Sequence, residues 1–228
     1  MVIPTDARGW ARLIDHTLLK PEATAEQIDR LCDECIENDF VAACVNPVWV
    51  ERAAARLDGA ATRVCSVAGF PLGASLAEIK AAEASRAVRQ GATEIDMVIN
   101  IGALTGGDAQ LVTRDIASVV DAVKTLDERV LVKVILETAV LDERQIVQGC
   151  RCTAEAQADF VKTSTGMHPA GGARVEHVAL LRKHAAPLKV KAAGGIRDLR
   201  IARAMLEAGA DRLGMSASVA VLAQLRNA

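Results

Sequence analysis

The sequence predicts a single α/β catalytic domain, residues 1–228, folded as a (β/α)8 TIM barrel with a short N-terminal helix. Three observations predict this fold. Short apolar runs alternate with amphipathic helical segments along the whole chain. There are eight such runs, and each is followed by a helical segment. The chain length of 228 residues is also close to the value of about 250 that is typical of this barrel.

The apolar runs have the character of parallel strands buried on both faces, because they are short and rich in Val, Ile, Leu and Ala. They are Leu13–Thr17, Val41–Val45, Val64–Ala68, Glu94–Ile99, Val130–Glu137, Phe160–Thr163, Lys189–Ala193 and Arg212–Ser216. An open, doubly wound sheet is the alternative arrangement. It normally has fewer strands, and no GxGxxG motif follows the first run here.

Helix start signals lie between these runs. A first helix, Thr5 to about Arg12, would cover the bottom of the barrel. Two segments match the capping box, in which the side chains of the first and fourth residues bond each other's backbone: Thr24–Gln27 and Ser75–Glu78. Pro47 suits the first position of a helix, and Asp142 can cap the helix after the fifth strand.

The composition argues against several classes of partner. Lys and Arg total 27 against 29 Asp and Glu, a net charge of −2, so the basic excess expected of a nucleic-acid binder is missing. Three Phe, two Trp and no Tyr are too few rings for a platform that stacks single strands. Hydrophobic residues make up 51% of the chain, which predicts a large aliphatic core and excludes disorder.

The sequence shows neither a membrane span nor an export signal. Its longest stretch without Asp, Glu, Lys or Arg is Val64–Ala77, and Gly69 and Pro71 interrupt it. Near the N-terminus, Pro4 and Asp6 interrupt any apolar core of a signal peptide. We therefore expect a cytoplasmic protein without a membrane partner.

The six cysteines are expected to be reduced thiols, since no export signal precedes them. A CxxC pair invites a test for zinc. Helical spacing places five residues of this segment on one helix face: Ile28, Leu31, Cys32, Cys35 and Ile36. Zinc would need two further ligands, and the sequence has no second CxxC and no HxxxH. Both sulfurs are therefore expected to pack in the core, and no metal site is predicted.

Three lysines interrupt predicted strands near their C-terminal ends, where active sites of this fold lie. They are Lys133, Lys162 and Lys191, each after an apolar run and on a strand next to another of the three. Asp96 interrupts the strand before them. One interpretation is that each lysine is a surface residue at a misassigned strand end. Three lysines at matched positions, with a carboxylate beside them, favour a polar cluster in the barrel mouth.

Such a cluster predicts amine chemistry. A buried ammonium group must pair with an acid or lose its proton. With three cations and few acids, at least one of the three lysines is expected to have a lowered pKa and to be a neutral amine near pH 7. A neutral lysine in a dry pocket is what Schiff-base formation with a carbonyl substrate requires. The pattern does not select which of the three is the nucleophile.

The last two strands predict a phosphate site. The segment Ala192–Arg197 follows the seventh strand, and its two glycines would let backbone N–H groups approach an anion. The segment Ser216–Ser218 follows the eighth strand and would open the final helix. A Gly-Gly pair alone is more often a tight turn, but this fold commonly binds phosphate after strands seven and eight.

Seven segments, each on or just after a predicted strand, resemble those of deoxyribose-phosphate aldolases. In chain order they are IDHTLLKP (14–21), CVNP (44–47), VAGFPLG (67–73), EIDMVIN (94–100), LVKVILE (131–137), FVKTSTG (160–166) and VKAAGG (190–195). The FVKTSTG segment is nearly diagnostic. The resemblance covers almost the whole chain.

The resemblance implies a class I aldolase, a carbon–carbon lyase that needs no metal and no cofactor. It would interconvert 2-deoxy-D-ribose 5-phosphate with acetaldehyde and D-glyceraldehyde 3-phosphate, in deoxyribonucleotide catabolism and carbohydrate degradation. Lys162 would form the Schiff base, and Lys191 would be the neighbouring cation that activates it. Asp96 would handle protons at the carbinolamine stage through water. A homodimer is expected from the family alone.

The resemblance also implies supporting and phosphate-binding roles. Lys133 would complete the charge network beside Asp96. Cys44, Asp15 and Thr17 would line the pocket near the sugar carbons. The phosphate would be held by Gly166, Gly194, Gly195 and Ser216.

Two departures from the family pattern affect the expected chemistry. Many members carry a basic residue directly after FVKTSTG, where this chain has Met167, so weaker dependence on the substrate phosphate is expected. Arg197 and His168 are the candidates to compensate. Some members also use a C-terminal tyrosine on a mobile tail for proton transfer. This chain ends Leu225–Ala228 without any tyrosine, so the enamine proton must move by water or another group.

Two rival functions fit part of the same pattern. The first is a Schiff-base aldolase for another phosphosugar, which would share Lys162 but not the DHTLLKP and DMVIN segments together. The second is a non-catalytic barrel that only binds a sugar phosphate. That function predicts the loss of a chemical residue, and Lys162, Lys191 and Asp96 are all present.

Overall fold

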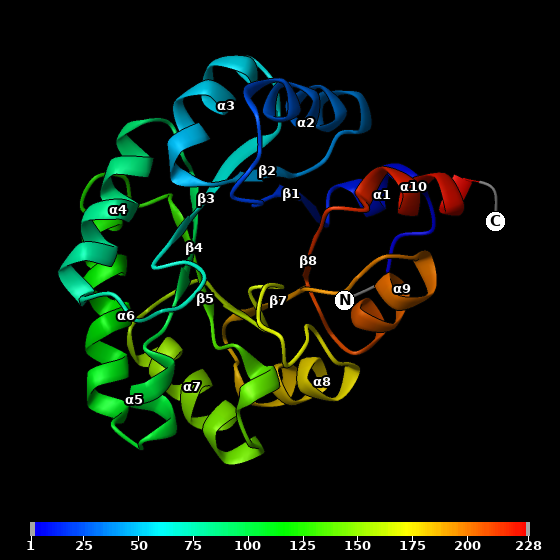
Figure 1. The fold of residues 1–228 in the computed structure, drawn as a ribbon. Helices are drawn as coiled ribbons and strands as arrows, with labels where there is room; N and C mark the ends of the chain where they lie inside the picture. The colour runs from blue at the N-terminus through cyan, green and yellow to red at the C-terminus, as the bar shows by residue number, and fades with distance from the viewer. Residues whose placement is uncertain (1–2, 227–228) are drawn as a thin grey trace.

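The computed structural model describes residues 3–226 and contains the predicted barrel. Within these residues, eight parallel strands form one closed sheet in the order β1 to β8, and β8 pairs back with β1. Helices surround the strands on the outside (Figure 1). The predicted (β/α)8 fold is confirmed, and the alternative of an open sheet is wrong because the sheet has no free edge.

The strands are short and almost entirely buried. They are β1 (Ile14–Leu18), β2 (Ala42–Val45), β3 (Arg63–Ala68), β4 (Glu94–Val98), β5 (Leu131–Ile135), β6 (Phe160–Lys162), β7 (Lys189–Ala193) and β8 (Arg212–Met215). Their ends differ from the predicted ends by at most two residues. The largest difference is at β5, which ends before Glu137 because that residue has φ of 60°, in the left-handed region that a strand cannot continue through.

Ten α-helices and two 3-10 helices connect the strands in the described residues. The α-helices are α1 (Ala7–Ala11), α2 (Ala25–Asn38), α3 (Val50–Arg56), α4 (Ala77–Arg89), α5 (Ile101–Thr105), α6 (Ala109–Lys124), α7 (Glu143–Glu155), α8 (Val175–His184), α9 (Leu199–Glu207) and α10 (Ser218–Arg226). The 3-10 helices are η1 (Pro47–Trp49) and η2 (Thr138–Val140). No helix within residues 3–226 is long and apolar enough to cross a membrane.

Most of the predicted helix starts are confirmed. Thr24 caps α2 in a complete capping box with Gln27. Asp142 caps α7, and Gln145 completes a second box that the sequence analysis did not predict. Pro47 opens η1. The predicted first helix exists as α1, which lies beside α10 (Figure 1). It lies at the amino-terminal edge of the barrel, where the carbonyl of its last residue, Ala11, accepts a hydrogen bond from the backbone N–H of Val41, just before β2.

The predicted capping box at Ser75 is wrong. Helix α4 begins at Ala77, and its N-cap residue Leu76 makes no side-chain cap bond. Tertiary contacts hold this first turn instead. Lys80 is fully buried, and its Nζ donates to the Val98 carbonyl at 2.9 Å and lies 2.7 Å from Asp115 Oδ2. Because a buried charge must be paired, this contact outweighs the local preference of Ser75 for an N-cap.

The predicted apolar face of α2 is confirmed except at its end. Ile28, Leu31, Cys32 and Cys35 are buried, whereas Ile36 is 46% exposed. Eight residues turn an α-helix by about 80° beyond two full turns, which moves Ile36 off the buried stripe. All six cysteines lie within the described residues, and they are free and buried. Burial raises the pKa of Cys32 to about 11, which suits a packed thiol.

Candidate active site

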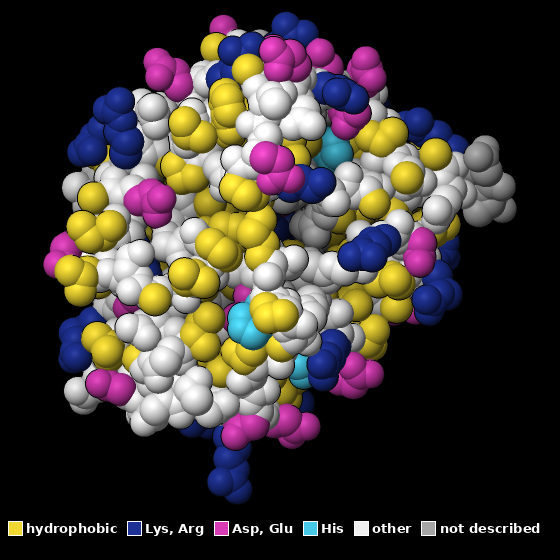
Figure 2. Space-filling view, in the orientation of Figure 1, with side chains coloured by type: hydrophobic (Ala, Val, Ile, Leu, Met, Phe, Trp, Pro, Cys, Tyr) yellow, Lys and Arg dark blue, Asp and Glu magenta, His cyan; other side chains and the backbone are white. Residues whose placement is uncertain are grey.

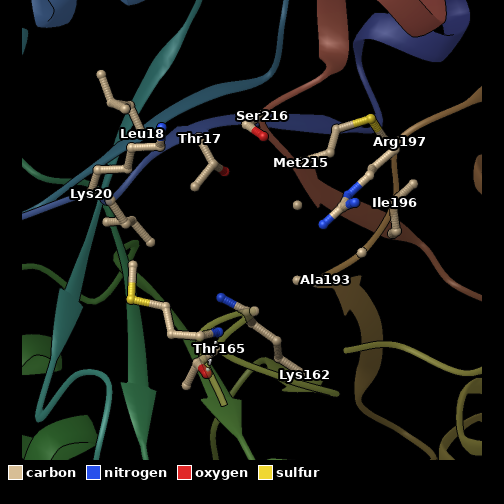
Figure 3. A pocket seen from close by; sticks show the side chains of 16 residues that line it. Thr17, Leu18, Lys20, Lys162, Thr165, Ala193, Ile196, Arg197, Met215 and Ser216 are labelled. Atoms are coloured by element: carbon tan, nitrogen blue, oxygen red, sulfur yellow. Dashed lines mark hydrogen bonds between the residues drawn. The ribbon is translucent and has the colours of Figure 1, made fainter. Parts of the chain in front are cut away.

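A cavity of about 250 Å³ opens at the carboxyl ends of the strands. It forms a hollow near the middle of the face seen in Figure 2, and Figure 3 shows its lining residues. These residues come from the ends of β1, β6, β7 and β8 and the loops that follow them. They include Thr17, Lys20, Lys162, Thr165, Gly166, Met167, Gly194, Gly195, Arg197 and Ser216. The cavity therefore brings together Lys162, Thr17 and all four residues predicted to hold phosphate.

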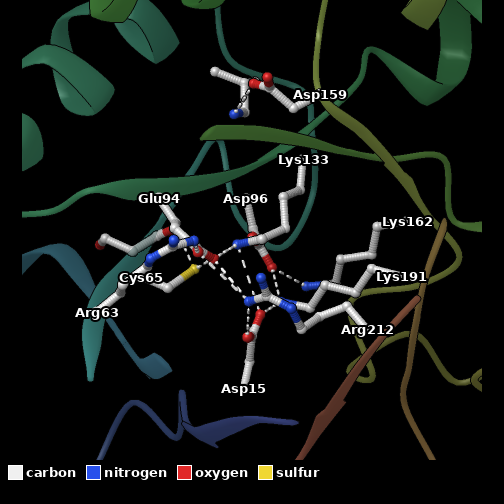
Figure 4. A network of polar contacts seen from close by, with 12 residues as sticks. Asp15, Arg63, Cys65, Glu94, Asp96, Lys133, Asp159, Lys162, Lys191 and Arg212 are labelled. Atoms are coloured by element: carbon white, nitrogen blue, oxygen red, sulfur yellow. Dashed lines mark hydrogen bonds and ion pairs between the residues drawn. The ribbon is translucent and has the colours of Figure 1, made fainter. Parts of the chain in front are cut away.

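Beneath the cavity, the barrel interior holds seven buried charged side chains, which we call the ionic cluster (Figure 4). Its members are Asp15, Glu94, Asp96, Lys133, Lys162, Lys191 and Arg212. None is more than 7% exposed. The surface alternative for the three lysines is therefore wrong, and the predicted polar cluster is confirmed.

Asp96 is the centre of the ionic cluster. Its Oδ2 lies 2.7 Å from Lys162 Nζ and 2.6 Å from Lys191 Nζ, while its Oδ1 lies 2.8 Å from Lys133 Nζ. One carboxylate therefore contacts all three lysines. Lys191 also lies 2.5 Å from Asp15 Oδ2.

The three lysines differ in depth. Lys162 and Lys191 are register partners on β6 and β7. Lys133 pairs with Phe160 and stands opposite Asp96, two residues before the register partner of Lys162. The positions predicted to match are therefore matched only for Lys162 and Lys191, and Lys133 lies one layer deeper. Of the three, Lys162 is the one that lines the cavity.

Two charged residues of the deeper layer were not predicted. Glu94 lies 2.6 Å from Lys133 Nζ and 3.1 Å from Arg212 Nη1, and Arg212 Nη1 lies 2.5 Å from Asp15 Oδ1. The half-exposed Arg63 closes the cluster at the amino-terminal end, with its Nη1 3.0 Å from Glu94 Oε1. A signal for Glu94 existed in the sequence. It stands two residues before Asp96, and such residues share one face of a strand.

Lys133 and Lys191 are not lysines of lowered pKa, which crowding was expected to produce in at least one of the three. Burial lowers the pKa of Lys191, but the carboxylates of Asp15 and Asp96 outweigh it and raise that pKa above its usual value. Burial also lowers the pKa of Lys133, but the nearby carboxylates, Asp96 foremost, outweigh it and raise that pKa well above its usual value. The expectation counted few acids, whereas the folded barrel places three carboxylates among these cations, and these raise the pKa of Lys133 and Lys191.

The carboxylates respond in the opposite direction. Burial raises the pKa of Asp96, but the positive charges around it, Lys133 foremost, hold that pKa well below the usual value. Burial also raises the pKa of Asp15, but the positive charges of Lys191 and Arg212 outweigh it, and the pKa of Asp15 is lowered. Lys133 and Arg212 lower the pKa of Glu94 against its burial. All three are therefore carboxylates at neutral pH.

Asp15 and Cys44, predicted to line the pocket near the sugar carbons, are buried and are not among the residues that line this cavity. Cys44 faces Cys65 in register on β3, and the Cys65 sulfur lies 3.3 Å from Asp96 Oδ1 and from Lys133 Nζ. Burial raises the pKa of Cys65 well above its usual value. A hydrogen bond with Cys65 lowers the pKa of Cys44.

Two groups of three donor atoms are close enough together to consider as metal ligands. They are Cys44 with Cys65 and Asp96, and Asp15 with Cys65 and Glu94. These donors already contact ammonium and guanidinium groups at hydrogen-bond distance. A metal cation there would meet like charges from Lys133 and Arg212, so the donor set does not favour a metal centre.

The phosphate-site loops are held by close backbone packing. Gly194 has φ of 90°, and a Cβ there would lie 2.9 Å from Gly166 Cα and 3.0 Å from Gly172 Cα. The loops after β6 and β7 therefore touch through glycine backbones. Glu137, buried at the end of β5, accepts a hydrogen bond from the Thr165 hydroxyl at 2.5 Å and so fixes the start of the β6 loop. The sequence analysis missed Gly172 and Glu137.

Basic side chains stand at the cavity mouth. Arg197 lines the cavity, as the prediction of a compensating charge requires. His168 is exposed and does not line the cavity, and its Nδ1 accepts a hydrogen bond from the Ala170 backbone N–H. Lys20 also lines the cavity and was missed, although it ends the DHTLLK segment. Met167 lines the cavity and is 42% exposed. A basic side chain at that position would therefore reach the cavity mouth.

The family model for "DeoC/LacD family aldolase" matches residues 10–224. The chain belongs to the DeoC/LacD aldolase family. It is 54% identical to the deoxyribose-phosphate aldolase of Brevibacillus brevis over 212 residues, 92% of this chain and 94% of the relative. Identity to the Halalkalibacterium halodurans deoxyribose-phosphate aldolase is 51% over 218 residues, 95% of this chain and 96% of the relative.

A solved structure supports the same assignment. The deoxyribose phosphate aldolase of Aeropyrum pernix, described as having a unique tetrameric structure, is 34% identical and superposes with a TM-score of 0.91. The match covers 98% of this chain and 94% of that structure. This DeoC/LacD family member is therefore an aldolase, a lyase, rather than the non-catalytic binding barrel considered from the sequence.

The ionic cluster predicts how stability depends on pH. In the unfolded chain its carboxylates bind protons near pH 4. The folded protein keeps them ionised to lower pH, so below about pH 5 the unfolded chain binds more protons and the free energy of unfolding falls. Urea unfolding at several pH values between 3 and 7 measures this. Asp15→Asn is expected to be about 3 kcal/mol less stable at pH 7, because it breaks a buried ion pair.

The same variant provides the control. Asp15→Asn should lose less stability than the wild type between pH 5 and pH 3, because it has one fewer carboxylate whose pKa differs between the folded and unfolded states. Equal losses in the two proteins would contradict the prediction.

Proposed function

We propose that residues 1–228 act as one class I aldolase domain that reversibly cleaves 2-deoxy-D-ribose 5-phosphate to D-glyceraldehyde 3-phosphate and acetaldehyde through a Schiff base on Lys162. One observation carries the choice of nucleophile. Lys162 lines the cavity, while Lys133 and Lys191 lie below its floor. The substrate is proposed from the relatives, which carry the name deoxyribose-phosphate aldolase.

In the first step, Lys162 Nζ attacks the aldehyde carbon C1 of the open-chain sugar. The resulting carbinolamine loses its hydroxyl as water, and an iminium cation remains. We assign Asp96 as the counter-ion of this cation, because its Oδ2 already lies 2.7 Å from Lys162 Nζ. Its low pKa makes Asp96 a weak proton acceptor by itself, so water in the cavity carries the protons that the step needs.

In the second step, the iminium draws electrons from the bond between C2 and C3. This bond breaks as the C3 hydroxyl loses its proton, which releases D-glyceraldehyde 3-phosphate and leaves an enamine on Lys162. Protonation of the enamine at C2 and hydrolysis then release acetaldehyde. Because the sequence contains no tyrosine, we assign this protonation to water in the cavity, which Thr17 on β1 also lines.

The phosphate is proposed to bind at the opposite end of the cavity. Gly166, Gly194 and Gly195 present backbone there, and Ser216 stands just before the first turn of α10. Backbone N–H groups and a helix N-terminus both favour an anion. Arg197 adds a positive charge at the mouth.

We further propose a homodimer in the cytoplasm. Large apolar side chains are exposed after the neighbouring strands β2 and β3: Val48, Leu72, Leu76 and Ile79. Exposed apolar clusters of this kind commonly mark contacts between subunits. Six free cysteines suit a reducing compartment, and cell fractionation would check the location. Sedimentation equilibrium should give twice 24.1 kDa, and Leu72→Asp should shift the protein towards the monomer. A wild-type monomer or tetramer would contradict the dimer.

Trapping the Schiff base tests the proposed mechanism. Incubation with acetaldehyde and borohydride is expected to convert one lysine to N-ethyl-lysine, which peptide mass spectrometry should map to Lys162. Lys162→Ala should abolish labelling and lower kcat by at least about 10⁴-fold, since it removes the nucleophile. The exposed Lys183 on α8 offers a control, because Lys183→Met should leave the label in place. Labelling at another lysine, or retained cleavage in Lys162→Ala, would refute the mechanism.

The cavity mouth predicts weak dependence on the substrate phosphate. Met167→Lys is expected to raise the ratio of kcat/KM for deoxyribose 5-phosphate to that for free deoxyribose by about five-fold, the effect of one exposed charge pair of about 1 kcal/mol. Steady-state kinetics with both substrates measure the ratio. Met167→Leu is the matched control and should keep the wild-type ratio. An unchanged ratio in Met167→Lys would contradict the prediction that Met167 weakens the dependence on the substrate phosphate.

A further inference from the structure

We propose that Glu94 and Arg212, which are not among the residues that line the cavity, set the charge of the ionic cluster so that Lys162 is the lysine left neutral. This inference rests on the proposed function, in which Lys162 is the nucleophile. Both residues are buried and stand at the first positions of β4 and β8. They are therefore positioning residues that act through the cluster, without contact with the substrate.

The charges of the ionic cluster can be counted. The cluster contains three carboxylates: Asp15, Glu94 and Asp96. It contains one guanidinium, Arg212, which stays protonated in proteins. If Lys133 and Lys191 are also charged, three positive charges balance three negative ones. A neutral Lys162 then leaves the cluster without net charge, whereas a protonated Lys162 adds an uncompensated charge inside the barrel, which is costly.

The contacts decide which lysines keep their protons. Lys133 Nζ lies 2.6 Å from Glu94 Oε2, 2.8 Å from Asp96 Oδ1 and 3.6 Å from Asp15 Oδ2. Lys191 Nζ lies within 2.6 Å of both Asp15 and Asp96. Lys162 has a single carboxylate partner in the described part of the chain, Asp96 Oδ2, and shares that oxygen with Lys191. The lysine with the fewest carboxylate partners, Lys162, is thus the one that lines the cavity.

The remaining groups around Lys162 do not alter the count. The other titratable or charged groups buried on the barrel strands are Asp15 (β1), Cys44 (β2), Cys65 (β3), Glu94 and Asp96 (β4), Lys133 (β5), Lys191 (β7) and Arg212 (β8). The two cysteines add no charge as thiols. Glu137 lies beyond the end of β5 and is bonded to Thr165. Lys20 and Arg197 stand exposed at the mouth, where solvent screens them.

The charge balance predicts shifts of opposite sign from two variants. Glu94→Gln removes a negative charge, so adding a proton to Lys162 becomes harder and imine formation persists to lower pH. Arg212→Gln removes a positive charge, so a proton on Lys162 is better tolerated and imine formation needs higher pH. Each shift is expected to be about one pH unit, the order produced by a buried unit charge at short range. The double variant restores the balance and should return to the wild-type profile.

The experiment measures the initial rate of cyanoborohydride-trapped acetaldehyde adduct between pH 5 and 9, by intact-protein mass spectrometry. Opposite shifts of the acid midpoint in Glu94→Gln and Arg212→Gln, cancelled in the double variant, support the proposal. A merely structural role would make the two losses add and would not move the midpoints in opposite directions. Shifts of one sign, no shifts, or no cancellation overturn it.

Matched controls separate charge from fold. Glu94→Asp and Arg212→Lys keep the charges and should keep the wild-type midpoint, and they also serve if a neutral variant does not fold. Arg63→Gln removes a charge that contacts Glu94 but is half exposed, so its shift should be clearly smaller than that of Arg212→Gln. A midpoint moved in Arg212→Lys, or an Arg63→Gln shift equal to that of Arg212→Gln, also overturns the proposal. A wild-type adduct away from Lys162 would instead refute the proposed function.

Discussion

The pairing of charges inside the barrel is the constraint on which the site depends. Barrels of this class normally fill their interior with layers of branched aliphatic side chains, whereas here β1, β4, β5, β6, β7 and β8 point carboxylates, ammonium groups or a guanidinium into the same space (Figure 4). Removing one partner of a buried ion pair costs about 3–5 kcal/mol, so each strand must keep its register for all of these charges to be compensated. The strand register that closes the sheet therefore also positions Lys162 beside Asp96.

A second buried pair extends this constraint outside the sheet. Lys80 on α4 and Asp115 on α6 meet behind β4, where Lys80 bonds the Val98 carbonyl and Asp115 Oδ2 accepts from the Asn100 backbone. The end of the strand that carries Asp96 is thus held from the helical layer as well as from the barrel interior. The loops after β6 and β7 are fixed by different means, the contact of Gly194 with Gly166 and the bond of Glu137 to Thr165. The proposed chemistry lies where these buried contacts meet the open cavity.

The sequence was sufficient to predict the fold and part of the ionic cluster, because a charge within an apolar run is a local signal. Lys133, Lys162, Lys191 and Asp96 all stood out in that way. Glu94 and Arg212 open their strands, where a charged residue also fits an exposed strand end. The spacing from Asp96 was a signal for Glu94, whereas nothing local marked Arg212 as buried. The raised pKa values of Lys133 and Lys191 were not foreseen for a similar reason, since they depend on carboxylates that distant strands bring in. The Ser75 capping box failed because a tertiary contact of Lys80 outweighed a local preference.

Charge balance also bears on the step after imine formation. Under the proposed charge balance, the cluster acquires an uncompensated positive charge when the iminium forms on Lys162, and Asp96 Oδ2, already shared with Lys191, offsets only part of it. A poorly compensated iminium is a stronger electron sink, and the electrons it draws come from the bond that has to break. Cleavage to the enamine removes this charge and restores the balance. In the proposed mechanism, the charge balance that leaves the Lys162 amine free to attack therefore also favours bond breaking over accumulation of the iminium. One set of buried ion pairs serves both steps.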